Sequence, residues 1–180
     1  SIKLVHPPRF SLPDDPNAPI VMFAGGTGVA PFRGFIHERV RQPGGDNWLY
    51  LGTRTRAEFY YQDEFEPIAA QGRLKVRPAF SRDAVDVVVK NGKFEFEPGE
   101  KRYIGDEMLR EDNARALWDI IRSKKDGGQG GYLYICGRTG FANSVMDAIK
   151  EILRRYSEGT PEEVEQQVNQ TLYRLVGEER

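Results

Sequence analysis

The residues with the clearest chemical potential form a glycine-rich turn. Residues 20–24 are a short continuous apolar run, which is typical of a strand buried on both faces. The turn after this run holds Gly25, Gly26, Thr27, Gly28 and, in the first helical turn, Pro31. A strand–turn–helix of this kind directs several backbone N–H groups to one point beside the positive end of a helix dipole, which suits a diphosphate. On spacing alone a purely structural turn remains an alternative, but the position after the first buried strand favours a nucleotide.

A second group of residues suggests which nucleotide. No Lys-Ser or Lys-Thr pair follows the glycines, which disfavours ATP hydrolysis. Past the predicted second strand, where an NAD site usually has an acidic residue, the sequence has Arg54. Ser81 and Arg82 end the third strand, and Lys101 and Tyr103 lie further along the chain. Hydroxyl, guanidinium and ammonium groups at neighbouring strand ends can bind a 2′-phosphate, and a tyrosine can stack on adenine. Ordinary solvated surface charge is the alternative.

The only cysteine of the chain is the third candidate. Cys136 ends the predicted fourth strand and Gly137 follows it, at the edge where parallel sheets bind ligands. His6 is expected in the N-terminal lead-in and His37 in the first helix, so no histidine is expected to activate the thiol. A contact beside a reactive cofactor ring therefore suits Cys136 better than nucleophilic attack, and a small buried apolar role is the plain alternative.

Alternating strands and helices position these residues. The pattern predicts further strands at residues 48–51, 74–80 and 132–136 and helices at 63–70, 104–124 in two pieces, and 142–156. Asn91-Gly92 predicts a type I′ turn in a hairpin inserted over about residues 85–98, and Thr160 is a credible cap for a charged helix over about 161–176. The fold class is therefore α/β, with a doubly wound, mostly parallel, Rossmann-like sheet. We expect a proline-rich, extended lead-in over residues 1–18 and one nucleotide-binding domain over 19–180.

Composition narrows the function further. The chain has 180 residues, with 26 Lys+Arg against 27 Asp+Glu and a formal charge of −1, which argues against a sequence-independent nucleic-acid partner. No apolar stretch approaches the ~20 residues that a membrane span needs. One cysteine excludes a multi-cysteine metal site, and no metal is expected. It also suggests a reducing compartment such as the cytoplasm.

In combination, the motifs resemble the NADP-binding module of the ferredoxin–NADP reductase superfamily, in particular the plant-type and diflavin branches that include cytochrome P450 reductase and sulfite reductase flavoprotein. Residues 22–35, MFAGGTGVAPFRGF, are similar to the pyrophosphate loop of that family. Residues 51–54, 80–82, 101–103 and 134–137 are similar to its later motifs. The departures are Thr53 where cysteine is common, Gly105 in place of a frequent glutamine, and Arg138 in place of aspartate.

The resemblance implies an NADPH-dependent flavoprotein reductase. NADP(H) would lie on the residues above, and Cys136 would face the FAD of an N-terminal domain that this sequence lacks. Hydride would pass from NADPH to FAD, and single electrons would then reach a ferredoxin, a flavodoxin or FMN domain, or a haem acceptor. The resemblance also implies a fragment cut at both ends, because the family's closing strand is missing, and such a fragment would be inactive alone. Two alternatives stay open, namely a non-catalytic NADP(H) sensor or regulatory module and a protein-interaction domain.

Overall fold

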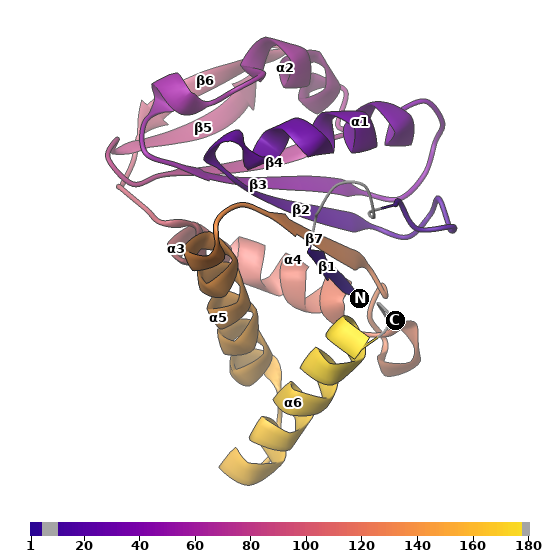
Figure 1. Ribbon diagram of the computed structural model, residues 1–180. Helices are drawn as coiled ribbons and strands as arrows, with labels where there is room; N and C mark the ends of the chain where they lie inside the picture. The colour runs from indigo at the N-terminus through magenta and orange to yellow at the C-terminus, as the bar shows by residue number, and fades with distance from the viewer. Residues whose placement is uncertain (5–10, 178–180) are drawn as a thin grey trace.

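A five-stranded parallel sheet forms the centre of the protein (Figure 1). The computed structural model describes residues 1–4 and 11–177. Every pair of neighbouring strands in this sheet is parallel. In spatial order the strands are β1 (Ile2–Leu4), β7 (Tyr132–Cys136), β2 (Ile20–Gly25), β3 (Asn47–Thr53) and β4 (Lys75–Phe80).

Helices cover both faces of the sheet, which confirms the predicted doubly wound α/β class. The face drawn uppermost in Figure 1 carries α1 (Ala30–Arg39) and α2 (Gln62–Ala70). The opposite face carries α3 (Ile104–Met108), α4 (Glu111–Ile121) and α5 (Thr139–Tyr156). The charged helix α6 (Pro161–Gly177) follows and packs on α5 and β1. Sequence periodicity therefore placed the helices correctly, including the break between α3 and α4.

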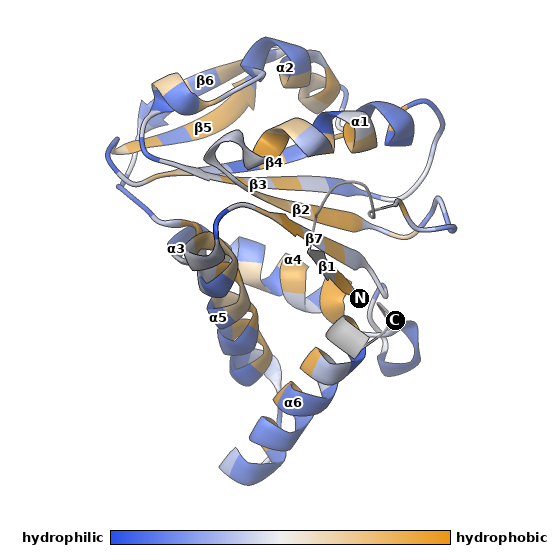
Figure 2. Ribbon diagram, viewed as in Figure 1, coloured by the Kyte–Doolittle hydropathy of each residue, from blue (hydrophilic) through white to orange (hydrophobic). Residues whose placement is uncertain are grey.

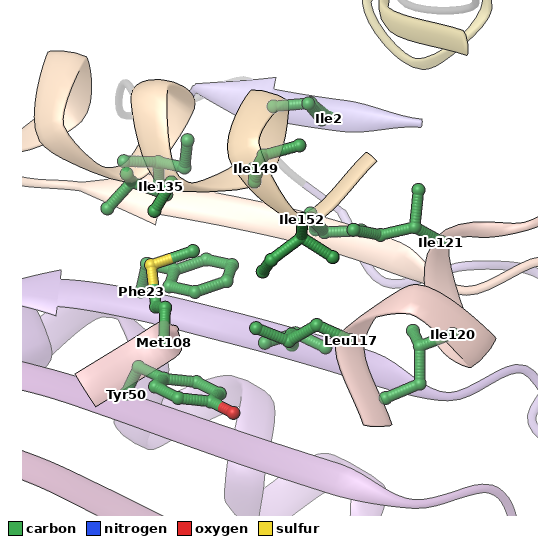
Figure 3. Close-up of a cluster of buried hydrophobic side chains, with 14 of the residues drawn as sticks. Ile2, Phe23, Tyr50, Met108, Leu117, Ile120, Ile121, Ile135, Ile149 and Ile152 are labelled. Atoms are coloured by element: carbon green, nitrogen blue, oxygen red, sulfur yellow. The ribbon is translucent and has the colours of Figure 1, made fainter. Parts of the chain in front are cut away.

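Alternation along the buried strands divides the core into two layers. In β2, Val21 and Phe23 join the cluster under α3–α5, whereas Ile20 and Met22 join the cluster under α1 and α2. Figure 3 shows the first cluster, in which Phe23 lies between the strands and the helices. Figure 2 shows apolar residues concentrated along the strands and on the helix faces toward the sheet. Both faces are buried, which is why the strand reads as a continuous apolar run.

The inserted segment forms an antiparallel hairpin of β5 (Val85–Lys90) and β6 (Lys93–Pro98). Asn91 and Gly92 have φ angles of 52° and 77°, as the predicted type I′ turn requires. The hairpin packs against α2 and β4 through a group of aromatic rings, which are Phe59, Phe80, Phe94 and Phe96.

Proline lies in β4, which is an edge strand of the sheet. The Ser81 N–H donates to the Thr53 carbonyl at 3.0 Å, so odd-numbered positions of β4 face β3. Pro78 therefore faces outward, where its missing N–H breaks no strand pairing. The Val76 carbonyl on the same outer side accepts a bond from the Arg77 guanidinium at 3.1 Å, which further protects the edge.

The N-terminal segment begins with an edge strand of the sheet. Residues 2–4 form β1, which pairs with β7 in the register Ile2–Leu133 to Leu4–Ile135. Ile2 is buried in the core layer between the sheet and α3–α5, so an apolar side chain stabilises a strand that is too short to be recognised from periodicity. Residues 5–10, including His6, lie outside the described residues. The predicted domain boundary at residue 18 stays a prediction.

No helix among the described residues is long and apolar enough to span a membrane.

Candidate nucleotide-binding site

The registers of the parallel strands bring the predicted residues to one edge of the sheet. Gly25 at the end of β2 is the register partner of Gly52 in β3, and Cys136 in β7 is the partner of Ala24. Thr53 is the partner of Phe80, the last residue of β4. The turns that follow these positions all lie at the carboxyl edge, where open α/β sheets bind ligands.

The glycine turn continues into a helical start. Gly26 has a φ of +55°, which glycine adopts without strain. Residues 26–29 then form a 3₁₀ turn that leads directly into α1. Pro31 lies in the first turn of α1, where its missing N–H costs no helical hydrogen bond. Because helix starts leave N–H groups without intrahelical acceptors, Gly26, Thr27 and Gly28 lie where an anion would accept bonds from the backbone.

Close packing requires glycine at position 28. A Cβ atom there would lie 2.4 Å from the carbonyl oxygen of Cys136. The turn therefore contacts the end of β7 through bare backbone. This contact places the candidate diphosphate turn beside Cys136 and Gly137.

A pocket of about 330 Å³ lies at the other end of this edge. It is lined by the end of β3, the residue that follows β4, and the first turns of α3 and α5. Arg54, Ser81 and Tyr103 are among its lining residues. Tyr103 is 73% exposed, so its ring is accessible to a planar ligand.

The other two predicted cations lie near this pocket without lining it. The Arg82 N–H donates to the Arg54 carbonyl at 2.8 Å, so the two backbones run side by side. Lys101 lies in a separate, more open depression, together with Asp106 and Leu109. Both cationic side chains are exposed. Across residues 1–4 and 11–177, neither forms an ion pair, which leaves both charges available to a ligand.

Arg54 is already paired with an acid that the sequence analysis did not single out. Its Nε lies 3.3 Å from Glu58 Oε1. The Glu58 carboxylate also accepts bonds from the hydroxyls of Thr53 at 3.3 Å and Thr55 at 3.4 Å. The i,i+4 spacing of Arg54 and Glu58 would have been a usable signal if a helical turn had been predicted there.

Phe141 is the second residue that the sequence analysis missed. Its ring lines the pocket and packs across the ends of three adjacent strands. A Cβ atom at Gly25, Gly52 or Gly137 would lie 2.8–2.9 Å from ring atoms. One aromatic ring therefore joins the glycine turn, the pocket and the segment after Cys136. Its place one turn after the fourth strand was the available signal.

Cys136 has the environment of a contact residue. Its thiol is free and half-buried, and burial raises the pKa of that thiol above its ordinary value. The neutral thiol therefore predominates at neutral pH, which disfavours nucleophilic attack. His37 is paired with Glu64 at 3.5 Å on α1 and α2. His6 is not among the described residues.

Several proteins are similar in sequence to most of this chain. The family model for the oxidoreductase NAD-binding domain matches residues 22–147. The sulfite reductase [NADPH] flavoprotein alpha-component of Vibrio parahaemolyticus is 36% identical over 168 residues, covering 91% of this chain and 23% of that protein. NADPH-dependent diflavin oxidoreductase 1 of Xenopus laevis is 35% identical, covering 79% of this chain and 20% of its own length.

A third relative gives the same result. NADPH–cytochrome P450 reductase of Drosophila melanogaster is 39% identical over 135 residues, covering 72% of this chain and 17% of that protein. The chain thus spans less than a quarter of the length of these three relatives. The matches confirm the predicted resemblance to the ferredoxin–NADP reductase superfamily. The chain belongs to the oxidoreductase NAD-binding domain family.

Proposed function

We propose that this chain is the NADP(H)-binding domain of an FAD-dependent oxidoreductase. It passes a hydride between NADPH and FAD, and the flavin then delivers single electrons to a redox-protein acceptor that carries a flavin, an iron–sulfur cluster or haem. The names of the relatives, which include NADPH-dependent reductases and a flavoprotein component, support this proposal. Their greater length leaves room for an FAD-binding domain outside this chain.

The observation that carries the proposal is the composition of the pocket at the ends of β3 and β4. Arg54 and Ser81 offer a guanidinium and a hydroxyl, and Arg82 lies alongside. These groups fit a phosphate monoester, which accepts charge-assisted hydrogen bonds. The exposed ring of Tyr103 on the same pocket fits an adenine. The 2′-phosphate and adenine of NADP(H) combine these two chemistries.

The rest of the nucleotide would extend along the sheet edge. The glycine turn would bind the diphosphate through N–H groups. Gly137 and Cys136 would contact the nicotinamide ring and hold it toward the flavin. When bound, NADPH supplies the hydride. The protein's residues fix the distance and face of the ring, and the neutral Cys136 thiol contacts it without reacting.

Isothermal titration calorimetry with 2′,5′-ADP and 5′-ADP tests the phosphate assignment. We expect the wild-type chain to bind 2′,5′-ADP more tightly. Arg82→Ala should weaken 2′,5′-ADP binding by about tenfold or more, the loss expected for a charge-assisted hydrogen bond, and leave 5′-ADP nearly unchanged. The matched control is Arg41→Ala, because Arg41 is an exposed arginine just after the far end of α1. An Arg82→Ala variant with unchanged preference would refute the assignment.

Rapid-mixing measurement of flavin reduction tests the catalytic part in the complete flavoprotein. NADPH should bleach the flavin absorbance faster than NADH, and Arg82→Ala should remove that difference. A protein that binds NADPH tightly but never reduces a flavin would instead be a non-catalytic sensor.

A further inference from the structure

We propose that Asp86, on the inserted hairpin, is a positioning residue for NADP(H) selectivity. It acts through Arg102 and holds the segment that carries Lys101 and Tyr103. The inference rests on the proposed function, because it assigns a role in binding the same nucleotide. It gives the hairpin, which lies in the chain between Arg82 and Lys101, a function at the site.

Arg102 is held from two sides. Its N–H donates to the carbonyl of Phe80 at 2.9 Å, which ties the segment to the end of β4 next to Ser81. Its guanidinium Nη1 lies 2.5 Å from Asp86 Oδ1. The Arg102 side chain is only 13% exposed, so this pair is screened less than a surface ion pair.

The anchoring of Arg102 also affects the two residues beside it in the chain, Lys101 and Tyr103. Lys101 and Tyr103 are exposed, whereas Arg102 between them is largely buried. Tyr103 has extended backbone angles, with φ −84° and ψ 168°. In an extended segment successive side chains point in opposite directions. Fixing Arg102 against the hairpin therefore directs Lys101 and Tyr103 away from the hairpin.

Asp86 is itself fixed by its surroundings. A Cβ atom at position 99 would lie 2.7 Å from Asp86 Cγ, so Gly99 packs directly on the carboxylate. The Gly99 N–H donates to the Ala84 carbonyl at 2.9 Å. Arg110 Nη1 also lies 3.5 Å from Asp86 Oδ1. The carboxylate is thus a fixed acceptor shared by two arginines.

The second arginine extends the network to the helix that Tyr103 precedes. Arg110 lies 3.3 Å from Glu107, which is buried in α3. At the start of the same helix, the Tyr103 N–H donates to Asp106 Oδ2 at 2.9 Å. Asp86 on the hairpin therefore pairs with Arg102 of the Lys101–Tyr103 segment and with Arg110, and Arg110 pairs in turn with Glu107 of α3.

Removal of the Asp86 carboxylate distinguishes a positioning role for Asp86 from direct phosphate binding by Arg102. If Arg102 were a phosphate ligand competing with Asp86, removal of the carboxylate would release the guanidinium and tighten binding. If Asp86 positions the segment, the same removal lets Lys101 and Tyr103 sample more conformations, which must then be ordered when the ligand binds. The two roles predict opposite changes in affinity.

Calorimetry on Asp86→Asn provides the test, with Glu97→Gln as the matched control. Glu97 lies directly across the hairpin from Asp86, and its carboxylate pairs with Lys90 at 2.6 Å. We expect Asp86→Asn to weaken 2′,5′-ADP binding by about threefold to tenfold, the cost of ordering one or two side chains, and to weaken 5′-ADP binding less. Glu97→Gln should bind both ligands like the wild type.

Two further variants keep the result interpretable. Asp86→Glu retains the charge and should restore part of the selectivity. On a Lys101→Ala background, Asp86→Asn should cause little additional loss of preference for 2′,5′-ADP, because residues that act through one contact are not additive. A full additional loss on that background, tighter binding by Asp86→Asn, or unchanged selectivity would overturn the inference. A wild-type chain without any preference for the 2′-phosphate would instead overturn the proposed function.

Discussion

Replacement of Gly28 by alanine probes the contact between the glycine turn and β7. The added Cβ atom would lie 2.4 Å from the Cys136 carbonyl oxygen and 2.9 Å from its carbonyl carbon. In proteins, Cβ atoms essentially never approach non-bonded heavy atoms within 3.0 Å. The obstacle is backbone at the end of a central strand, so a rotamer change cannot relieve the clash. Either the turn or the strand end must shift.

The expected cost follows from this distance. Overpacking of a well-packed site costs about 1–3 kcal/mol, and a clash with backbone places Gly28→Ala toward the upper end. For a protein of this size, each 1 kcal/mol lowers Tm by about 2–4 °C. We therefore expect Gly28→Ala to unfold about 5–10 °C below the wild type. Either shift changes the position of the glycine turn relative to β7, so binding of 5′-ADP should also weaken.

Gly34→Ala is the matched control, since it makes the same change about 9 Å further along the same helical segment. Gly34 lies inside α1 and is exposed, and a Cβ atom added there would meet no other atom within 4 Å. Alanine there should stabilise the protein by about 0.5–1 kcal/mol. Thermal and urea unfolding measure both variants. A Gly28→Ala protein at least as stable as the wild type would show that the turn does not contact β7 as described.

Three other substitutions test separate features of the structure. Glu58→Gln removes the charge that pairs with Arg54 at 3.3 Å. Because Glu58 would then no longer compete with the ligand phosphate for Arg54, 2′,5′-ADP binding should tighten by about twofold to fivefold, the strength of a surface ion pair. Weaker binding would contradict this competition between Glu58 and the phosphate. The buried Tyr50 hydroxyl has no hydrogen-bond partner within the described part of the chain. Tyr50→Phe should therefore leave the free energy of unfolding unchanged or raise it by up to about 1 kcal/mol. A loss above about 2 kcal/mol would show that the hydroxyl has a hydrogen-bond partner. Burial raises the pKa of Glu107 above its ordinary value, although Arg110 opposes this. Folding therefore favours the protonated Glu107 carboxyl, and the free energy of unfolding should fall as pH rises from the pKa of Glu107 in the unfolded chain to its pKa in the folded protein. Urea titrations at a series of pH values should show that Glu107→Gln flattens this dependence of stability on pH.

Much of the site's layout could be predicted from the sequence because local rules set it. The continuous apolar run of residues 20–24 predicts a strand buried on both faces, and the glycines and Pro31 predict the turn and helix start. Asn91-Gly92 predicts the hairpin turn in the same way. Each of these signals depends on a few adjacent residues and on the two-sided burial of a parallel sheet.

The features that the sequence analysis missed depend on contacts between distant residues. β1 has three residues, and it is a strand because β7 offers it a partner. Phe141 acquires its position from Gly25 in β2, Gly52 in β3 and Gly137 just after β7. Asp86 and Arg102 are sixteen positions apart, and their pairing depends on how the hairpin folds back. Pair distances of this kind are set by tertiary packing rather than by periodicity.

Under the proposed function, strand order also constrains how a flavin domain can approach. Cys136 ends β7 and Phe80, just before Ser81, ends β4, with β2 and β3 between them. Three strand spacings separate the two ends by about 14 Å. Under the proposed function the nicotinamide lies at β7 and the 2′-phosphate at β4, so the flavin must approach from the β7 side. The hairpin lies on the β4 side. It can therefore hold the phosphate-binding segment without obstructing the end of the nucleotide where the hydride is transferred.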